Sequence, residues 1–267
     1  NEVISLFGEG ENKVLNVPIA SFQGGVSVNA AVGQPYGIIR GKDFIYTNGQ
    51  RTVNEDGYYL TSDNSDEIIG DPNPDWIGGI NNSLSYKNFT LGFLIDIRSG
   101  GDIFSLDQYY GEGTGLYPVT AAVNQKGFPS RLPVEDGGGV LLPGVKEDGT
   151  PNDIYAENLD GDGVTPFGYA ANNYGETPRS LYTFDGSFVK LREVSLSYSL
   201  PASLIQRMGV FQSVDLQLIG RNLWIIHKNM EFSDPEEGLS SGNAGRGYQG
   251  GAYPALKNYG FNVRLNF

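Results

Sequence analysis

Tyr259-Gly-Phe-Asn-Val-Arg-Leu-Asn-Phe267 alternates between apolar and polar residues along its whole length, and this stretch decides the fold class. Successive side chains of a β-strand point to opposite faces, so Tyr259, Phe261, Val263, Leu265 and Phe267 would share one apolar face. Chain ends usually fray into water, which makes so apolar a final strand unusual in a soluble protein. An outer-membrane barrel fits better, because it turns its apolar face to lipid and its polar face to the lumen.

The composition agrees with a barrel. The 267 residues include 38 Gly, 16 Tyr and 14 Phe, 18% of the chain is charged, and the mean hydropathy is -0.28. A chain that is polar on average yet rich in aromatic residues is typical of β-barrels, since only alternate residues form their apolar face. No run approaches the roughly 18 to 20 consecutive apolar residues of a transmembrane helix, so any membrane passage must use strands.

The charge and the cysteine content exclude several classes of function. A net charge of -13 and a pI near 4.4 argue against nucleic acid as a partner, because its phosphates would be repelled. The absence of cysteine rules out a disulfide framework and thiolate metal sites. The first residue is Asn1 and no signal-peptide pattern follows it, so we expect either processing of the chain or a fragment.

Other segments repeat the two-faced alternation. Residues 89–98 alternate most clearly, and the two-residue turn Lys87-Asn88 joins them to a weaker strand, which predicts a β-hairpin over 76–98. Residues 187–224 are predicted to form two strands, the first ended by Pro201, with two helical turns from Ala202 to Gly209 between them. A terminal strand over 255–267 completes the set.

Long connections alternate with short ones. Residues 99–186 and 225–254 are rich in Gly, Pro, Asp and Asn, whereas the turns near Lys87 and Pro201 are short. Outer-membrane barrels have short periplasmic turns, so the long segments are predicted to be extracellular loops. Residues 1–75 would form mainly another extracellular loop, with the top of an ascending strand at 3–7.

The predicted strands are too few to close a barrel. About five or six are present, whereas about eight is the practical minimum for a membrane barrel. We therefore expect the C-terminal part of a longer polypeptide, or one chain of a split barrel. The fold class that the residues predict is all-β: the C-terminal strands and long extracellular loops of a transmembrane antiparallel β-barrel.

Several short motifs resemble one family, the SusC/RagA-like TonB-dependent outer-membrane transporters. The matching stretches are Gly70-Asp-Pro-Asn-Pro-Asp-Trp76, Tyr86-Lys-Asn-Phe89, Asp185-Gly-Ser-Phe-Val-Lys-Leu-Arg192, Gly220-Arg-Asn-Leu-Trp224 and the Phe267 ending. They run in family order and spacing over about 33–267, whereas residues 1–32 match poorly. The resemblance implies that the chain is the C-terminal barrel portion of such a transporter.

The resemblance also implies a function. Such a transporter has a barrel of about 22 strands with a plugged lumen. It lies in the outer membrane of a Gram-negative bacterium, contacts lipid, and works with a SusD-like surface lipoprotein that lids the barrel. The pair imports glycans or peptides, with energy from TonB acting on the plug. The plug, the TonB box and the N-terminal part of the barrel lie outside these residues.

Catalysis has little support in the residues. His227 is the single histidine and lies in a predicted loop, so a Ser-His-Asp arrangement would depend on it alone. Asp234 with Glu236 or Glu237 has the carboxylates that glycoside hydrolysis needs, but in a chain with 31 acidic residues the favoured interpretation is a solvated acidic loop. We expect no enzyme activity and no catalytic residue.

A calcium site is a second possibility to weigh. Asn158, Asp160 and Asp162 alternate as in the first half of a calcium-binding loop. The twelfth position is Tyr169, where the loop needs a bidentate glutamate, so a plain Asp-Gly turn is the favoured interpretation. We expect no cofactor, with calcium as the open alternative.

Candidate binding residues come from the loops and from the lumen-facing side of the strands. Aromatic rings stack on sugars and hydroxyl groups bind polar ligands, so tyrosines of the long loops are candidate substrate contacts; the alternative is that they pack a loop core or meet a lid. These candidates are Tyr109, Tyr110, Tyr117, Tyr155 and Tyr169. Asp215 and Arg264 are predicted at similar depth on neighbouring strands, where they would form a cross-strand pair.

Three functions compete at this stage. The first is an energised importer of glycans or peptides, of which this chain supplies barrel wall and outer loops. The second is a soluble or surface β-sandwich that binds glycans, in which the same alternation faces a soluble core. The third is a fragment of a glycoside hydrolase. A need for detergent would separate the first from the second.

Overall fold

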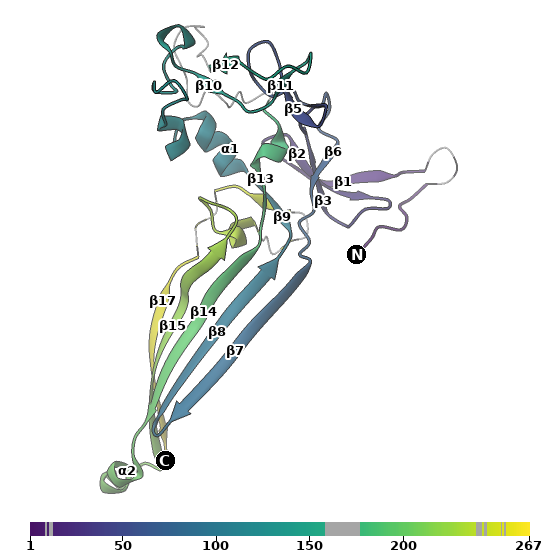
Figure 1. Cartoon of the computed structure of the whole chain (residues 1–267). Helices are drawn as coiled ribbons and strands as arrows, with labels where there is room; N and C mark the ends of the chain where they lie inside the picture. The colour runs from purple at the N-terminus through teal and green to yellow at the C-terminus, as the bar shows by residue number, and fades with distance from the viewer. Residues whose placement is uncertain are drawn as a thin grey trace. The chain divides into compact units, whose positions relative to one another are not determined.

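The computed structural model describes residues 1–8, 10, 13–157, 177–238, 242, 245–251, 253 and 255–267. The chain forms two compact units, each built from three separate segments of sequence (Figure 1). The first unit comprises Asn1–Asn73, Asp102–Phe184 and Gly238–Ala252. The second unit comprises Pro74–Gly101, Asp185–Glu237 and Tyr253–Phe267.

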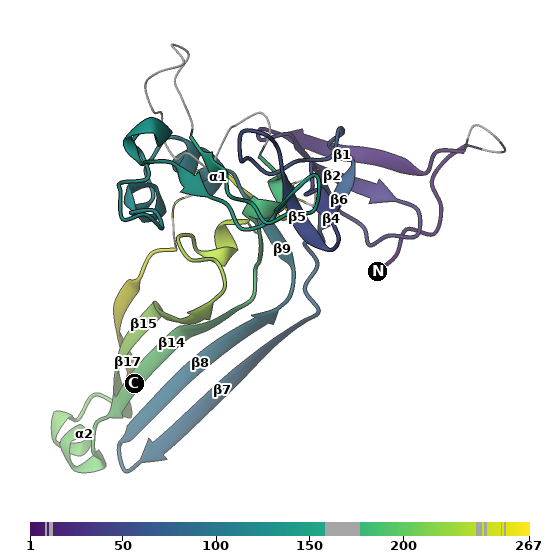
Figure 2. The same ribbon diagram turned by 45° about the horizontal axis from the view of Figure 1, so that its top comes forward.

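The second unit is a five-stranded antiparallel sheet in the order β17-β15-β14-β8-β7. Figures 1 and 2 show long strands lying side by side. Their bounds are β7 (Trp76–Tyr86), β8 (Phe89–Ser99), β14 (Phe188–Ser199), β15 (Ser213–Lys228) and β17 (Asn258–Asn266). The five strands expected over 76–98, 187–224 and 255–267 are present, because alternation with a period of two matches the two faces of a strand and not those of a helix.

Two tight connections join these strands. Tyr86 pairs with Phe89 across a two-residue turn, and Lys87 adopts a positive φ of 54°, as a hairpin turn of this length requires. The Asn88 side-chain amide donates to the Ser199 carbonyl at 2.7 Å, which links the hairpin tip to β14. After Pro201, helix α2 (Ala202–Met208) leads to β15 and ends at Gly209, with φ 70°.

The strand register places all the alternating apolar residues on one face of the sheet. Leu218 of β15, for example, lies between Leu196 of β14 and Phe261 of β17. Leu218 is 57% exposed and Phe261 is 64% exposed. A β-sandwich would bury such a face against a second sheet, whereas here the apolar rows remain uncovered. The opposite face carries Ser, Asn, Gln and charged residues.

The first unit contains short strands and helical turns. Its sheets have the orders β1-β2-β3-β6, β11-β5-β4, β13-β9-β16 and β10-β12. The strands are β1 (Asn16–Phe22), β2 (Val26–Ala31), β3 (Ile38–Gly41), β4 (Tyr46–Thr47), β5 (Gln50–Val53), β6 (Glu67–Gly70), β9 (Asp102–Ser105), β10 (Val140–Leu141), β11 (Val145–Lys146), β12 (Tyr155–Ala156), β13 (Thr183–Asp185) and β16 (Tyr248–Gln249). The helices are α1 (Leu106–Gly113), η2 (Pro118–Ala121), η3 (Val134–Asp136) and η4 (Arg179–Tyr182), and η5 (Pro235–Gly238) begins in the second unit.

Two hydrophobic clusters form the core of the first unit. One contains Phe104, Tyr109 and Tyr182, and the other is built around Phe44 and Tyr59. The Arg179 guanidinium lies 4.8 Å from the centre of the Tyr109 ring. The tyrosine and phenylalanine side chains of these long segments therefore hold the segments together.

This packing corrects two expectations about the long segments. The absence of periodicity in 1–75 and 99–186 does not mean an absence of regular structure, because strands of two to seven residues are too short to show a clear alternation. The strand expected at 3–7 is wrong: Val3 donates its backbone N–H to Gln34 and accepts from Gly33 as an isolated contact. Within the described ranges, no helix has the length and apolar character needed to cross a membrane.

Candidate functional site

A β-bulge on the polar side of the sheet positions the candidate site. Leu191 pairs with Ile95 and Glu193 with Leu94, so Arg192 is an extra residue relative to β8. On the other side, two residues of β15, Asn222 and Leu223, lie opposite Arg192. Asn222 takes a positive φ of 52°, which asparagine tolerates better than most residues. Bulges of this kind redirect side chains and are common beside functional sites.

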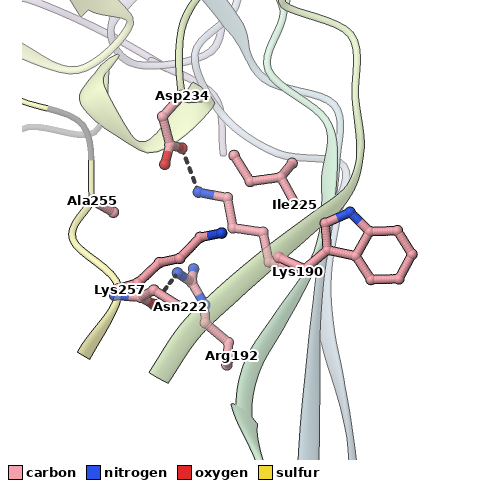
Figure 3. Close-up of a pocket in the computed structure, with 8 residues that line it drawn as sticks. Lys190, Arg192, Asn222, Ile225, Asp234, Ala255 and Lys257 are labelled. Carbon is pink, nitrogen blue, oxygen red and sulfur yellow. Dashed lines mark hydrogen bonds and ion pairs between the residues drawn. The ribbon is translucent and has the colours of Figure 1, made fainter. Parts of the chain in front are cut away.

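Arg192 and Lys190 bind three carboxylates. Arg192 donates to Asp96 of β8, with Nε 2.8 Å from Oδ2, and forms a two-pronged ion pair with Glu236. Lys190 donates to Asp234 (Figure 3). It also donates to Glu236, at 2.6 Å. The connection that follows β15 is therefore held against the polar face of β14 by four charged side chains.

The cluster is buried enough for these contacts to matter. The side chains of Lys190 and Asp234 are 5% and 6% exposed, and that of Glu236 is 28% exposed. Removing one partner of a buried pair leaves an uncompensated charge, which costs roughly 3–5 kcal/mol. The cluster thus favours one conformation of the 229–238 connection.

The pKa of Glu236 reflects the same contacts. Burial raises this pKa, but hydrogen bonds from Arg192 and Lys190, together with their positive charges, outweigh burial and lower it below its ordinary value. Glu236 is therefore ionised at neutral pH. A carboxylate held in this way is a poor general acid, so the Asp234 and Glu236 pair is unsuited to glycoside hydrolysis. The solvated acidic loop expected from the sequence is also wrong, since these carboxylates are paired.

Two hollows flank Arg192. One has a volume of about 280 Å³ and is lined by Lys190, Arg192, Asn222, Trp224, Ile225, Asp234, Ala255 and Lys257 (Figure 3). The other, of about 430 Å³, is lined by Leu94, Asp96, Arg192, Glu193, Arg221, Asn222 and Asn258. An exposed ion pair between Arg221 and Glu193, at 2.8 Å, borders the second hollow. We call the first hollow the bulge pocket.

The tyrosines proposed from the sequence do not form one site. Tyr109 is 2% exposed and packs in the core, which is the alternative weighed for these tyrosines. Tyr110 is 38% exposed beside it, and Tyr117 packs over Gly111 of α1. Tyr155 lies in β12 under the Lys126 ammonium, 3.6 Å from its ring centre. Tyr169 lies outside the described residues.

The two residues predicted to pair across neighbouring strands, Asp215 and Arg264, are in register. Asp215 of β15 is directly paired with Arg264 of β17, and both line a hollow of about 290 Å³ with Ser197, Gln217 and Asn262. The Asp215 carboxylate accepts a hydrogen bond from Ser199 Oγ at 2.5 Å. Among the ion pairs of the described ranges, none joins Asp215 to Arg264 within 4 Å.

The residues considered for metal binding and catalysis do not form a site within the described ranges. Asn158, Asp160 and Asp162 lie outside the described residues, so the calcium hypothesis stays a prediction. In the part of the chain that the structure describes, no three His, Cys, Asp or Glu side chains gather as metal ligands. His227 is exposed and faces Asn229, 3.1 Å away.

Sequence comparison finds receptors of one kind. No family model matches the chain. Two TonB-dependent receptors of Formosa agariphila, P3 and P26, are each 27% identical to it, over 224 and 228 residues. Each alignment covers 82% of this chain, which spans about a fifth of the length of these relatives (19% and 20%).

Structure comparison finds the same kind of protein. The RagAB peptide importer in its open-open state has a TM-score of 0.58 at 18% identity, over 100% of this chain and 25% of the other. Its closed-closed state has a TM-score of 0.56 at 18% identity, over 95% and 25%. In sequence the chain is similar to TonB-dependent receptors, and its all-β fold is that of part of a TonB-dependent transporter barrel.

Proposed function

We propose that this chain is part of an energised importer in the outer membrane of a Gram-negative bacterium. One observation carries the proposal: a five-stranded sheet with one exposed apolar face and one polar face, in a chain related to TonB-dependent receptors. Lipid would cover the apolar face, and the polar face would line the lumen. The long segments of the first unit would be extracellular.

The substrate class is the finer part of the proposal. The structural relatives are named as a peptide importer, which favours peptides over glycans as the cargo. Tyr110, Tyr117 and Tyr155 remain candidate contacts, because each keeps at least part of its ring accessible. A SusD-like surface lipoprotein is the expected partner, on the resemblance to SusC/RagA-like transporters, and TonB would act through a plug outside this chain.

Uptake in the native bacterium tests the proposal. The full-length gene is deleted and cells are given fluorescent oligopeptides or oligosaccharides of matched size. We expect deletion to abolish uptake of one class, and a protonophore to abolish it in the wild type, because TonB-dependent transport draws on the inner-membrane proton gradient. Restoring the gene should restore uptake.

The location of the protein provides an independent control. The full-length protein should fractionate with outer membranes and need detergent for extraction, and a tagged copy should co-purify a lipoprotein. Unchanged uptake of both classes after deletion would contradict the importer. A soluble, detergent-independent protein would favour the glycan-binding sandwich instead.

A further inference from the structure

The connection between β14 and β15 exposes several apolar side chains. Leu204 and Met208 of helix α2 are 45% and 49% exposed, and Val210, just after the helix, is 64% exposed. Figure 1 shows α2 at the same end of the sheet as the C-terminus. A connection that lies in water is expected to be polar. Apolar side chains gathered on a surface in this way mark a contact with a partner or a membrane.

Helix α2 has one apolar side and one polar side. Leu204 and Met208 are four residues apart and therefore lie on the same side of the helix, and Ile205 lies next to them. Ile205 is only 7% exposed, so this part of the helix surface is packed against the protein. The rest of the helix surface is polar and exposed, and it is formed by Ser203, Gln206 and Arg207.

The burial of the first residues of β15 shows which face of the sheet the connection covers. Val214 lies on the apolar face between Leu200 and Leu265 and is 6% exposed. Leu218 is also flanked by apolar residues in both neighbouring strands, yet it is 57% exposed. Helix α2 contacts β15, so the connection accounts for the additional cover of Val214. The connection therefore lies on the apolar side of the sheet.

Two aromatic rings extend the apolar face into this connection. Phe267 directly follows β17 and continues the alternation of Phe261 and Leu265. The Phe211 ring, in the residues after α2, lies 5.1 Å from the Phe267 ring. The apolar face of the sheet is thus continuous with the apolar residues of the connection.

The length of β15 indicates how deep the connection would lie in a membrane. The apolar side of β15 runs from Val214 to Trp224, which at about 3.3 Å per residue and a tilt of about 40° spans about 25 Å. The apolar band of an outer-membrane barrel is also about 25 Å tall, so these residues already fill it. The residues just before Val214 would therefore lie at the level of the lipid headgroups.

We propose that α2 lies in the headgroup layer of the membrane leaflet at this end of the sheet, with Leu204 and Met208 turned to the lipid chains. An amphipathic helix binds there by burying its apolar side at the boundary between headgroups and acyl chains, and Arg207 is placed to reach the phosphates. Lipid is the occupant because the apolar side of α2 continues the apolar face of the sheet. The inference rests on the proposed function for the membrane, and it adds that this connection is bound to lipid.

Nitroxide labels on the full-length protein in lipid vesicles test the inference. Leu204→Cys and Met208→Cys are labelled singly, in a protein without other cysteines. Gln206→Cys is the matched control on the polar side of the same helix, and Leu218→Cys is the reference for lipid. Collisions with oxygen report lipid, and collisions with a nickel chelate report water. We expect the ratio of oxygen to nickel collisions to be about three- to fivefold higher at the two apolar positions than in Gln206→Cys, because only the apolar side enters the acyl chains.

The reference label separates this inference from the proposed function. A lipid-like ratio in Leu218→Cys, with equal and water-like ratios in Leu204→Cys and Gln206→Cys, would overturn the inference alone and leave the apolar residues of α2 to a protein partner. A water-like ratio in Leu218→Cys would contradict the membrane barrel itself, and the inference with it. All three helix positions are exposed, so the labels fit without disturbing the packing of Ile205.

Discussion

The two units place their apolar side chains in opposite environments. In the first unit, Ile103 and Phe104 are completely buried. In the second unit, Leu218 and Phe261 are more than half exposed although they lie in the middle of well-paired strands. Burial stabilises the first unit by removing apolar surface from water, whereas the second unit offers the same kind of surface to its surroundings. The first unit is therefore suited to water, and the apolar face of the second unit is suited to an apolar environment.

The largest expected effect concerns the core of the first unit. Phe104→Ala should cost about 3–5 kcal/mol of unfolding free energy, because it leaves a cavity among Tyr109, Tyr182 and Val26. Phe261→Ala should cost less, since lipid can fill the space it leaves. Hydrogen exchange of the full-length protein reports each unit separately. Equal losses at the two positions would mean that the apolar face of the sheet is packed like a core.

A smaller effect tests which face meets lipid. Leu218→Arg should destabilise the protein by about 2–4 kcal/mol in a bilayer if the residue lies near the midplane, whereas Gln217→Arg should change stability little, because its side chain lies on the polar face of the sheet. The two positions are adjacent in β15, so the variants differ in the face of the strand that is changed and not in its position along the chain. Urea unfolding in lipid vesicles measures both. A greater loss for Gln217→Arg would reverse the assigned faces.

The last prediction concerns the effect of acid on the charges that are buried in the second unit. The pKa of Glu236 is lowered in the folded protein, so its stabilising contribution is complete above the unfolded pKa and is lost as the pH falls through the folded value. Proteolysis of the 229–238 connection should therefore increase only below about pH 4.5. In Glu236→Gln the cleavage rate should already be raised at neutral pH. A rise in cleavage centred between pH 6 and 7 would point to another group.

The strands of the second unit are predictable from sequence, and there is a physical reason for this. Each strand faces two different environments, so polarity reverses at every residue, as it does from Tyr259 to Phe267. The helix end at Gly209 was also predictable, because glycine readily takes a positive φ. The hairpin turn at Lys87 was predictable from the alternating segments on either side of two residues, although lysine itself rarely takes a positive φ.

The first unit and the charged cluster were much harder to predict. Short strands such as Val26–Ala31 are buried on both faces and therefore do not alternate. Tyr109 could be either a substrate contact or a core residue, because a loop aromatic and a core aromatic look alike in sequence. The pairing of Lys190 with Asp234 spans 44 residues, and only the lysine and arginine two residues apart on a strand hinted at it.

The single extra residue at Arg192 shifts the phase of β14. Before it, the odd-numbered Leu191 lies on the apolar side; after it, the even-numbered Val194 and Leu196 do. Deleting Arg192 would leave every strand intact but exchange the two sides on one half of β14, bringing serines to the apolar face or leucines to the polar face. The extra residue thus keeps the apolar side chains of both halves of β14 on the same face of the sheet.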